Sequence, residues 1–127
     1  MKNLIIAAST AFLSQATELV GSPAATYANK VCIVNSAGFV MYFNMNNLRT
    51  GQDSSNTSHY PILQSQCMEI ATAFPNDVRE GDYVMPHVHA IIGSTKAVDT
   101  VLIYSLLSGT ATYMCHGATL TYHCKLL

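Results

Sequence analysis

The spacing of apolar residues after residue 30 most constrains the fold of this chain. Short apolar runs alternate with turn residues, and no window of eleven or more residues carries the spacing of an amphipathic helix. β-Branched and aromatic residues are frequent in these runs, as is typical of strands. We therefore expect an all-β domain, a small antiparallel β-sandwich or a jelly-roll-like barrel of about seven strands. The expected strands lie within 30–35, 39–44, 62–70, 83–92, 101–104, 111–116 and 119–126.

Two segments differ from ordinary interior strands. Pro86 interrupts the run 83–92, so we expect this strand at a sheet edge or at a bulge. The polar stretch 46–59 has almost nothing to bury and predicts an exposed loop. It contains Asn56-Thr57-Ser58, an N-glycosylation sequon, which fits a glycoprotein with a sugar chain on Asn56.

The first 29 residues differ from the rest of the chain. A basic start is followed by an apolar stretch over 4–13 and by the small-residue triplet Ser14-Gln15-Ala16, which together resemble a secretory signal peptide. The alternative is a retained anchoring helix in which residues 4–20 contact a membrane surface or a partner. The apolar stretch is too short for a transmembrane helix. We expect residues 1–29 to precede a β-sandwich domain at 30–127.

Charge is scarce along the chain. Its 127 residues and 13.7 kDa suit one domain, 50% of the residues are hydrophobic, and only 10% are charged. This composition excludes an intrinsically disordered chain. The formal net charge is -1, so the chain lacks the excess positive charge that binds a phosphate backbone, and we expect no nucleic-acid partner. The apolar surplus instead predicts protein partners or self-association.

The cysteines predict two disulfides. Cys32, Cys67, Cys115 and Cys124 form an even set without the close pairs of a zinc site. After a signal-like segment, this set indicates oxidised pairs in the secretory pathway or outside the cell; the alternative is buried free thiols in a reducing compartment. Strand alternation points Cys115 and Cys124 to the core. All three pairings stay open, and because a Cys115–Cys124 bridge would need an offset hairpin, pairing each with Cys32 or Cys67 fits at least as well.

Histidines supply the only chemical lead in the sequence. His87 and His89 share one face of a strand, away from the core, and could contact one metal ion. His116 and His123 also fall opposite the core face of their own strands. If the three strands are neighbours, three or four imidazoles converge, and imidazole is the commonest protein ligand of transition metals.

The segment 81–89 (GDYVMPHVH) resembles the start of the first cupin motif, in which five residues separate a glycine from a His-x-His pair. The resemblance implies a jelly roll with one transition metal ion at His87 and His89. The match covers nine residues, the glutamate expected after the second histidine is missing from 91–94, and the second motif is absent. The competing interpretation has both histidines facing solvent on an amphipathic strand, with no cofactor.

The runs 39–43 and 102–107 are apolar on both faces, although only one face of a strand can meet a given core. We expect the second face to contact another subunit, or each strand to lie between two packed layers. The residues expected at such an interface are Phe39, Met41, Phe43, Leu102 and Tyr104.

No catalytic motif stands out, since the glycines do not cluster and no Gly-x-Ser-x-Gly elbow occurs. We therefore expect a non-enzymatic structural or interaction subunit, secreted or held in a larger assembly through its apolar faces and its N-terminal segment. One alternative is a secreted module that binds a small molecule or glycan at the 46–59 loop. The other is a metal-dependent, cupin-like jelly-roll enzyme that uses His87 and His89.

Overall fold

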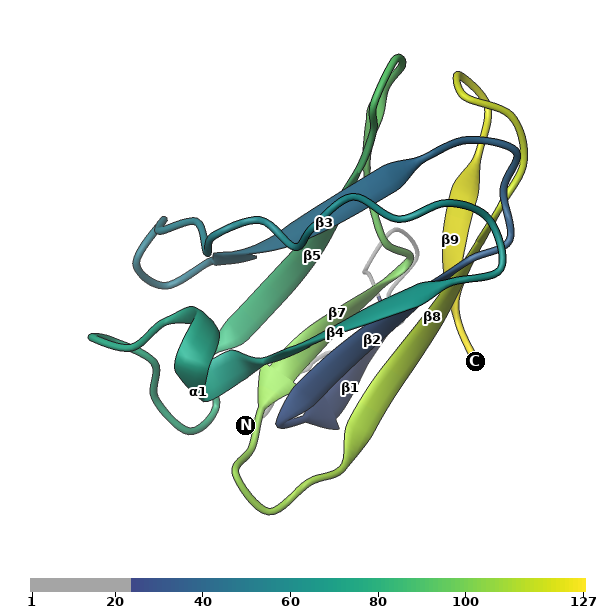
Figure 1. Cartoon of the computed structure of the whole chain (residues 1–127). Coiled ribbons are helices and arrows are strands. Elements are labelled where there is room, and N and C mark those ends of the chain that lie inside the picture. The colour runs from purple at the N-terminus through teal and green to yellow at the C-terminus, as the bar shows by residue number, and fades with distance from the viewer. Residues whose placement is uncertain (1–23) are drawn as a thin grey trace, which may run out of the picture.

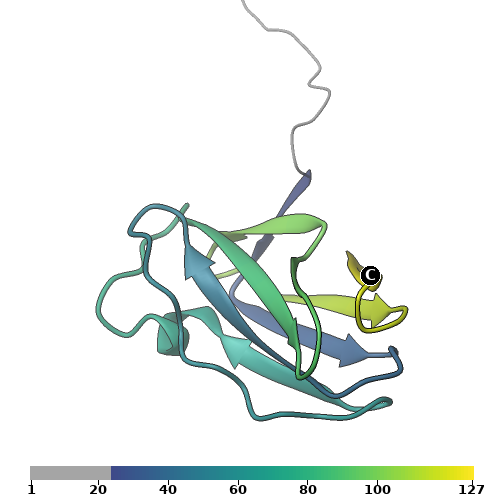
Figure 2. The same cartoon turned by 90° about the horizontal axis from the view of Figure 1, so that it is seen from above.

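The computed structural model describes residues 24–127, and these residues form two β-sheets that face each other across a core (Figures 1 and 2). One sheet has five strands in the order β1-β7-β5-β3 with β6 paired to β5, and the other has four in the order β4-β2-β8-β9. The all-β prediction is confirmed. The elements are β1 (Ala24–Ala28), β2 (Lys30–Asn35), β3 (Met41–Asn47), β4 (Ser65–Glu69), α1 (Ile70–Ala73), β5 (Tyr83–Ala90), β6 (Thr95–Ala97), β7 (Thr100–Tyr104), β8 (Thr110–His116) and β9 (His123–Leu126).

The strands differ in number and direction from the expected set of about seven antiparallel strands. Residues 24–127 hold nine strands, because the sequence pattern did not predict β1 and β6. β1 pairs with β7 and β2 pairs with β8 in parallel, so both sheets are mixed. Among the described residues, the first strand begins at Ala24, within the range 1–29 that we expected to precede the domain. The expected signal peptide or anchoring helix falls on residues 1–23, outside the described part of the chain.

Of the two places expected for the strand with Pro86, a sheet edge or a bulge, the edge is wrong. β5 lies inside its sheet, with β3 on one side and two partners on the other. β7 pairs with Tyr83 and Val84, and β6 pairs with 87–89, so Pro86 falls in the gap between these partners. Its carbonyl accepts a hydrogen bond from Val98 N on that side, and the N–H and C=O groups of one strand residue point the same way. The missing N–H therefore faces the gap, where neither β6 nor β7 pairs with Pro86.

The outer edge of β3 is covered by the polar segment 52–60. This segment runs antiparallel to β3, and Met41 and Tyr60 exchange backbone hydrogen bonds of 3.0 and 2.8 Å. Ser54 N donates to Met45 O at 2.7 Å. Most of the segment is exposed, as expected, but Ser54 and Tyr60 are buried. An open strand edge invites pairing with another chain, so this cover protects β3 from it.

Three buried tyrosines tie the two sheets together across the core. Each hydroxyl donates to a backbone carbonyl of the facing sheet, which satisfies a buried polar group on both sides. Burial raises the pKa of each phenol, so all three remain protonated donors at neutral pH. The donor and acceptor pairs are Tyr113 to Thr100 (2.5 Å), Tyr122 to Val88 (2.9 Å) and Tyr60 to Ile33 (3.0 Å).

Both expected disulfides are present, and each joins residues directly opposite on neighbouring antiparallel strands. Cys32 on β2 pairs with Cys67 on β4, and Cys115 on β8 pairs with Cys124 on β9. The second register needs no offset, so the expectation that a Cys115–Cys124 bridge requires an offset hairpin is wrong. Cys115 and Cys124 point to the core, as predicted, whereas Cys32 and Cys67 lie on the outer face of the four-stranded sheet.

Replacing both Cys32 and Cys67 with serine is expected to lower the free energy of unfolding by about 3–4 kcal/mol, because the bridge closes a long loop in the unfolded chain. The loop spans 35 residues, against 9 for the other disulfide. Serine fits at both positions because neither faces the core. Urea denaturation measures the loss, and thiol titration of the denatured, unreduced wild type should find no free thiol. Four free thiols would contradict the oxidised pairing.

Candidate functional site

The four histidines of the expected metal site lie on two opposite outer faces. His87 and His89 share the outer face of the five-stranded sheet, as strand alternation predicts. His116 and His123 are cross-strand partners on the outer face of the four-stranded sheet. The expected convergence is wrong, because β5 and the β8–β9 pair belong to different sheets. Within residues 24–127, no group of three or more His, Cys, Asp or Glu side chains is placed to hold a metal ion.

His89 uses both ring nitrogens inside the protein. Nδ1 lies 2.9 Å from Thr95 Oγ1, and Nε2 lies 2.8 Å from Asn44 Oδ1. Burial, and to a lesser degree the neighbouring His87, lowers the pKa of His89 and favours the neutral ring. A neutral ring has one donor and one acceptor nitrogen, so Nε2–H donates to Asn44 and Nδ1 accepts from Thr95. Neither nitrogen is left for the metal that the cupin resemblance implies.

Tyr42 stands between two imidazoles on the same outer face. Its ring centroid lies 4.9 Å from that of His59 and 4.7 Å from that of His89, and both pairs are stacked. The segment 52–60 and β5 flank β3 on opposite sides, so the imidazoles cover both faces of the phenol. A saccharide stacks on an open aromatic face, and Tyr42 offers none. The stack instead holds the segment 52–60 against the sheet.

The side chains expected at an interface lie in the domain's own core. Phe39 is partly buried against Tyr122, with ring centroids 4.7 Å apart. In the run 39–43, alternate side chains turn inward, and the outward Tyr42 is covered by imidazoles, so this strand needs no second partner. The interface prediction is therefore wrong for the four buried side chains, whereas Phe39 keeps some exposure. The buried set is Met41, Phe43, Leu102 and Tyr104.

Asn56 lies on the exposed side of the segment 52–60. The neighbouring Thr57 fixes the segment, because its Oγ1 accepts a hydrogen bond from Phe43 N at 3.0 Å. Ser58, the third residue of the sequon, is also exposed. The geometry leaves Asn56 accessible, and its glycosylation stays a prediction.

Exposed aliphatic side chains gather at one end of the sandwich, which we call the aliphatic end. The loops 36–40, 61–64, 91–94 and 117–122 meet there, because β2, β5 and β8 end at this level while β3 and β4 begin. The β5–β6 and β8–β9 loops project beyond the sheets (Figure 1). The exposed side chains of this end are Val40, Ile62, Leu63, Ile91, Ile92 and Leu120.

The sequence analysis missed the aliphatic end. Its residues stand in turn segments such as PILQ (61–64) and IIGS (91–94), where polar residues are the rule. The presence of aliphatic residues within turns could have indicated this surface. Strand periodicity does not reveal it, because periodicity identifies the residues that face the core. Ile92 and Leu63 are 85% and 84% exposed, so they contribute little to that core.

Hydrogen bonds hold the loops of the aliphatic end together. Ile91 N donates to Val40 O at 3.1 Å, and the hydroxyl of Ser94 donates to Thr119 O at 3.2 Å. A Cβ on Gly93 would lie 2.1 Å from the Thr119 methyl, so the 91–94 and 117–122 loops are in direct contact. Their apolar side chains are thus presented by a fixed backbone.

Asn35, at the end of β2, connects two further loops of the aliphatic end. Its buried amide nitrogen donates to Phe39 O at 2.7 Å and to Tyr60 O at 3.1 Å, and its Oδ1 accepts from Ala37 N at 2.9 Å. Its backbone carbonyl accepts from Leu63 N at 2.7 Å. One fully hydrogen-bonded buried amide therefore positions both the 36–40 and the 61–64 loop.

Leu63 adopts a left-handed backbone conformation with a φ of 72°, and no other non-glycine residue described in 24–127 has a positive φ. This conformation costs a leucine about 1–2 kcal/mol. Its side chain is exposed, so core packing does not compensate for the strain. Strain that persists without a packing gain is a recognised mark of functional sites.

The opposite end of the sandwich carries the charges. Arg49 forms a bidentate pair with Asp82 at 2.8 and 3.0 Å and also donates to Asp77 at 2.7 Å. Asp82 accepts further bonds from Asn47 Nδ2 and Arg79 N. The Arg49 guanidinium holds the pKa of Asp82 well below its usual range. These bonds lock the loops after β3 and before β5 together.

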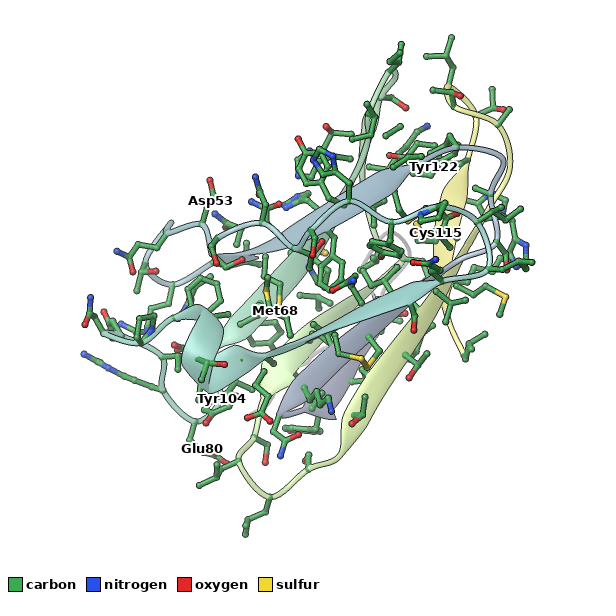
Figure 3. The ribbon with its side chains drawn as sticks, in the orientation of Figure 1. Asp53, Met68, Glu80, Tyr104, Cys115 and Tyr122 are labelled. Atoms are coloured by element: carbon green, nitrogen blue, oxygen red, sulfur yellow. A yellow bond between two sulfur atoms is a disulfide. The ribbon has the colours of Figure 1, made fainter. Side chains whose placement is uncertain are left out.

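The two ends therefore differ sharply in charge. None of the four loops of the aliphatic end contains Asp, Glu, Lys or Arg. Behind them, Lys96 Nζ lies 5.8 Å from the ring centroid of Tyr122. Glu80, at the charged end, lies far from Tyr122, at the aliphatic end (Figure 3). This separation makes the aliphatic end the candidate functional surface of the domain.

No protein-family model matches the chain, and no curated protein matches it. Among residues 24–127, the structure has no helix with the length and apolar character to cross a membrane.

Asp82→Asn is expected to lower the free energy of unfolding by roughly 2–3 kcal/mol at neutral pH, because Arg49 loses its charged partner. The pKa of Asp82 is lowered in the folded state, so its contribution is complete above the pKa of an unfolded aspartate, about 4, and is lost as the pH falls. The difference between wild type and variant should shrink in acid. Urea denaturation at neutral and acidic pH measures this, with Asp53→Asn, at an exposed position, as control. If the difference in free energy of unfolding between wild type and Asp82→Asn does not change with pH, the ion pair is not its cause.

Proposed function

We propose that this chain is a non-enzymatic interaction domain of the secretory pathway or the extracellular space, which works by covering its aliphatic end with an apolar surface. One observation carries the proposal: six exposed aliphatic side chains stand on four loops that contain no charged residue. Soluble domains seldom expose clustered apolar side chains without a partner.

The covalent structure supports the proposed compartment. Two disulfides are compatible with the secretory pathway or the extracellular space and are rare in reducing compartments. The exposed sequon at Asn56 fits the same location. A signal peptide in residues 1–23 belongs to the same proposal.

Polar clusters of the described residues support a non-enzymatic role, because their groups are engaged with one another. Arg49 and Asp82 satisfy each other at the charged end. His89 has a hydrogen-bond partner on each ring nitrogen. Side chains that are engaged in this way hold loops in place, and neither ring nitrogen of His89 is left over for a metal ion.

The fixed backbone of the aliphatic end also favours binding. The hydrogen bonds of Asn35 and Ser94 hold the loops before any partner arrives. A surface that is ordered in advance loses little conformational entropy when it is covered, so more of the apolar burial appears as affinity.

The double variant Ile92→Asp with Leu120→Asp is expected to abolish association through the aliphatic end, because it places charges where apolar side chains must lose water. The wild type should bind the dye ANS and show a concentration-dependent sedimentation coefficient, and the variant should lose both. Fluorescence titration and sedimentation velocity measure the two effects.

Leu107→Asp is the matched control, because Leu107 is 95% exposed in the β7–β8 loop, at the opposite end of the sandwich. This variant should behave as the wild type in both measurements. The proposal fails if the wild type shows neither dye binding nor association, or if Leu107→Asp is the change that removes them. Circular dichroism verifies that all three proteins are folded.

A further inference from the structure

We infer that the surface covering the aliphatic end is a phospholipid bilayer, and that the 61–64, 91–94 and 117–122 loops enter its interfacial layer. This inference rests on the proposed function and names the partner of the same surface. It assigns docking to folded loops of the domain, and so differs from the expectation that residues 4–20 contact a membrane.

The shape of the aliphatic end suits a broad, deformable surface. Its exposed side chains come from loops of both sheets, and the β5–β6 and β8–β9 loops stand out beyond the strands (Figure 1). A protein partner would need a matching hollow for each projection. A second copy would bring its own projecting loops, so two such ends meet over a small area and associate only weakly. A bilayer interface accepts several separate apolar projections at once.

The distribution of charge also suits a bilayer. Moving a charged side chain into the acyl region is expensive, and the four loops carry none. The first basic groups lie behind the loops, where lipid headgroups would be: Lys96 follows the 91–94 loop, and His116 and His123 flank the 117–122 loop. The carboxylates of Asp77, Glu80 and Asp82 lie at the far end, away from lipid phosphates.

The side chains behind the exposed aliphatic residues are small and carry hydroxyl groups, which suits the hydrated interfacial layer of a bilayer. Ser94 and Thr119 are already hydrogen-bonded to each other, so the contact between the two loops needs no water. A groove of about 290 Å³ lies beside them, lined by Phe39, Val40, Ile91, Ile92 and Thr119. Its apolar walls suit the upper part of a lipid chain.

Leu63 gives an independent argument. Its backbone is strained, and glycine or asparagine would relieve the strain at an exposed turn. A leucine is explained there by what its side chain does outside the protein. Insertion of this side chain between lipids provides such a gain.

The test is flotation of the full-length chain with phosphatidylcholine vesicles. The wild type should float with the vesicles, and binding should persist at high salt, because apolar insertion is not screened as ion pairing is. Ile92→Asp with Leu120→Asp should weaken partitioning by at least about tenfold, whereas Leu107→Asp should leave it unchanged. Leu63→Gly should raise the melting temperature and weaken partitioning several-fold.

Four results would overturn the inference. Equal flotation of the wild type and the Ile92→Asp, Leu120→Asp variant would assign membrane contact to another segment. Loss of flotation in Leu107→Asp would assign it to the opposite end. A wild type that binds ANS and self-associates through the aliphatic end, yet does not float, would identify a protein partner; this refutes the bilayer while the proposed function survives. A wild type that shows none of the three behaviours refutes both.

Discussion

The architecture depends on the hydrogen bonds that buried tyrosine hydroxyls make across the core. Apolar packing alone would let the two sheets slide past each other, because it has little directional preference. The hydroxyls of Tyr113 and Tyr122 each donate to a defined carbonyl of the facing sheet, so they fix the relative placement of the sheets. Tyr122 also lies 2.6 Å from Ser94 O, which extends this placement to the β5–β6 loop. The alignment of the sheets and the arrangement of the aliphatic end thus share one side chain.

The low charge content of the chain takes on a physical meaning in this arrangement. The few charged residues are concentrated, and the Arg49 network uses several of them to close one end of the sandwich. The other end is left without charge and closes through the amide of Asn35 and through backbone bonds. One end of the domain is thus held by ion pairs and the other by uncharged hydrogen bonds, so the two ends present different surfaces to a partner.

Local alternation was readable from the sequence, and long-range pairing was not. The twofold period of a strand places His87 and His89 outward and Cys115 and Cys124 inward, and both predictions are confirmed by burial. Which strands become neighbours depends on contacts across the whole chain, and this separated the two histidine pairs that were expected to meet. The cover on β3 uses backbone hydrogen bonds, which leave little trace in side-chain patterns. The pairing of β1 also leaves little trace in the local sequence, because its parallel partner β7 lies far along the chain.

The two disulfides occupy different environments, and this gives the molecule two chemically distinct sulfur pairs. Cys115 and Cys124 are shielded by the core, whereas Cys67 is open to solvent on the outer face of β4. A mild water-soluble reductant therefore reaches the outer pair first, while the inner pair keeps β8 and β9 joined. The freed thiol of Cys67 sits on a sheet face, away from the loop apexes of the aliphatic end. A spectroscopic label attached there would report the tilt of the domain on a surface without standing between the two.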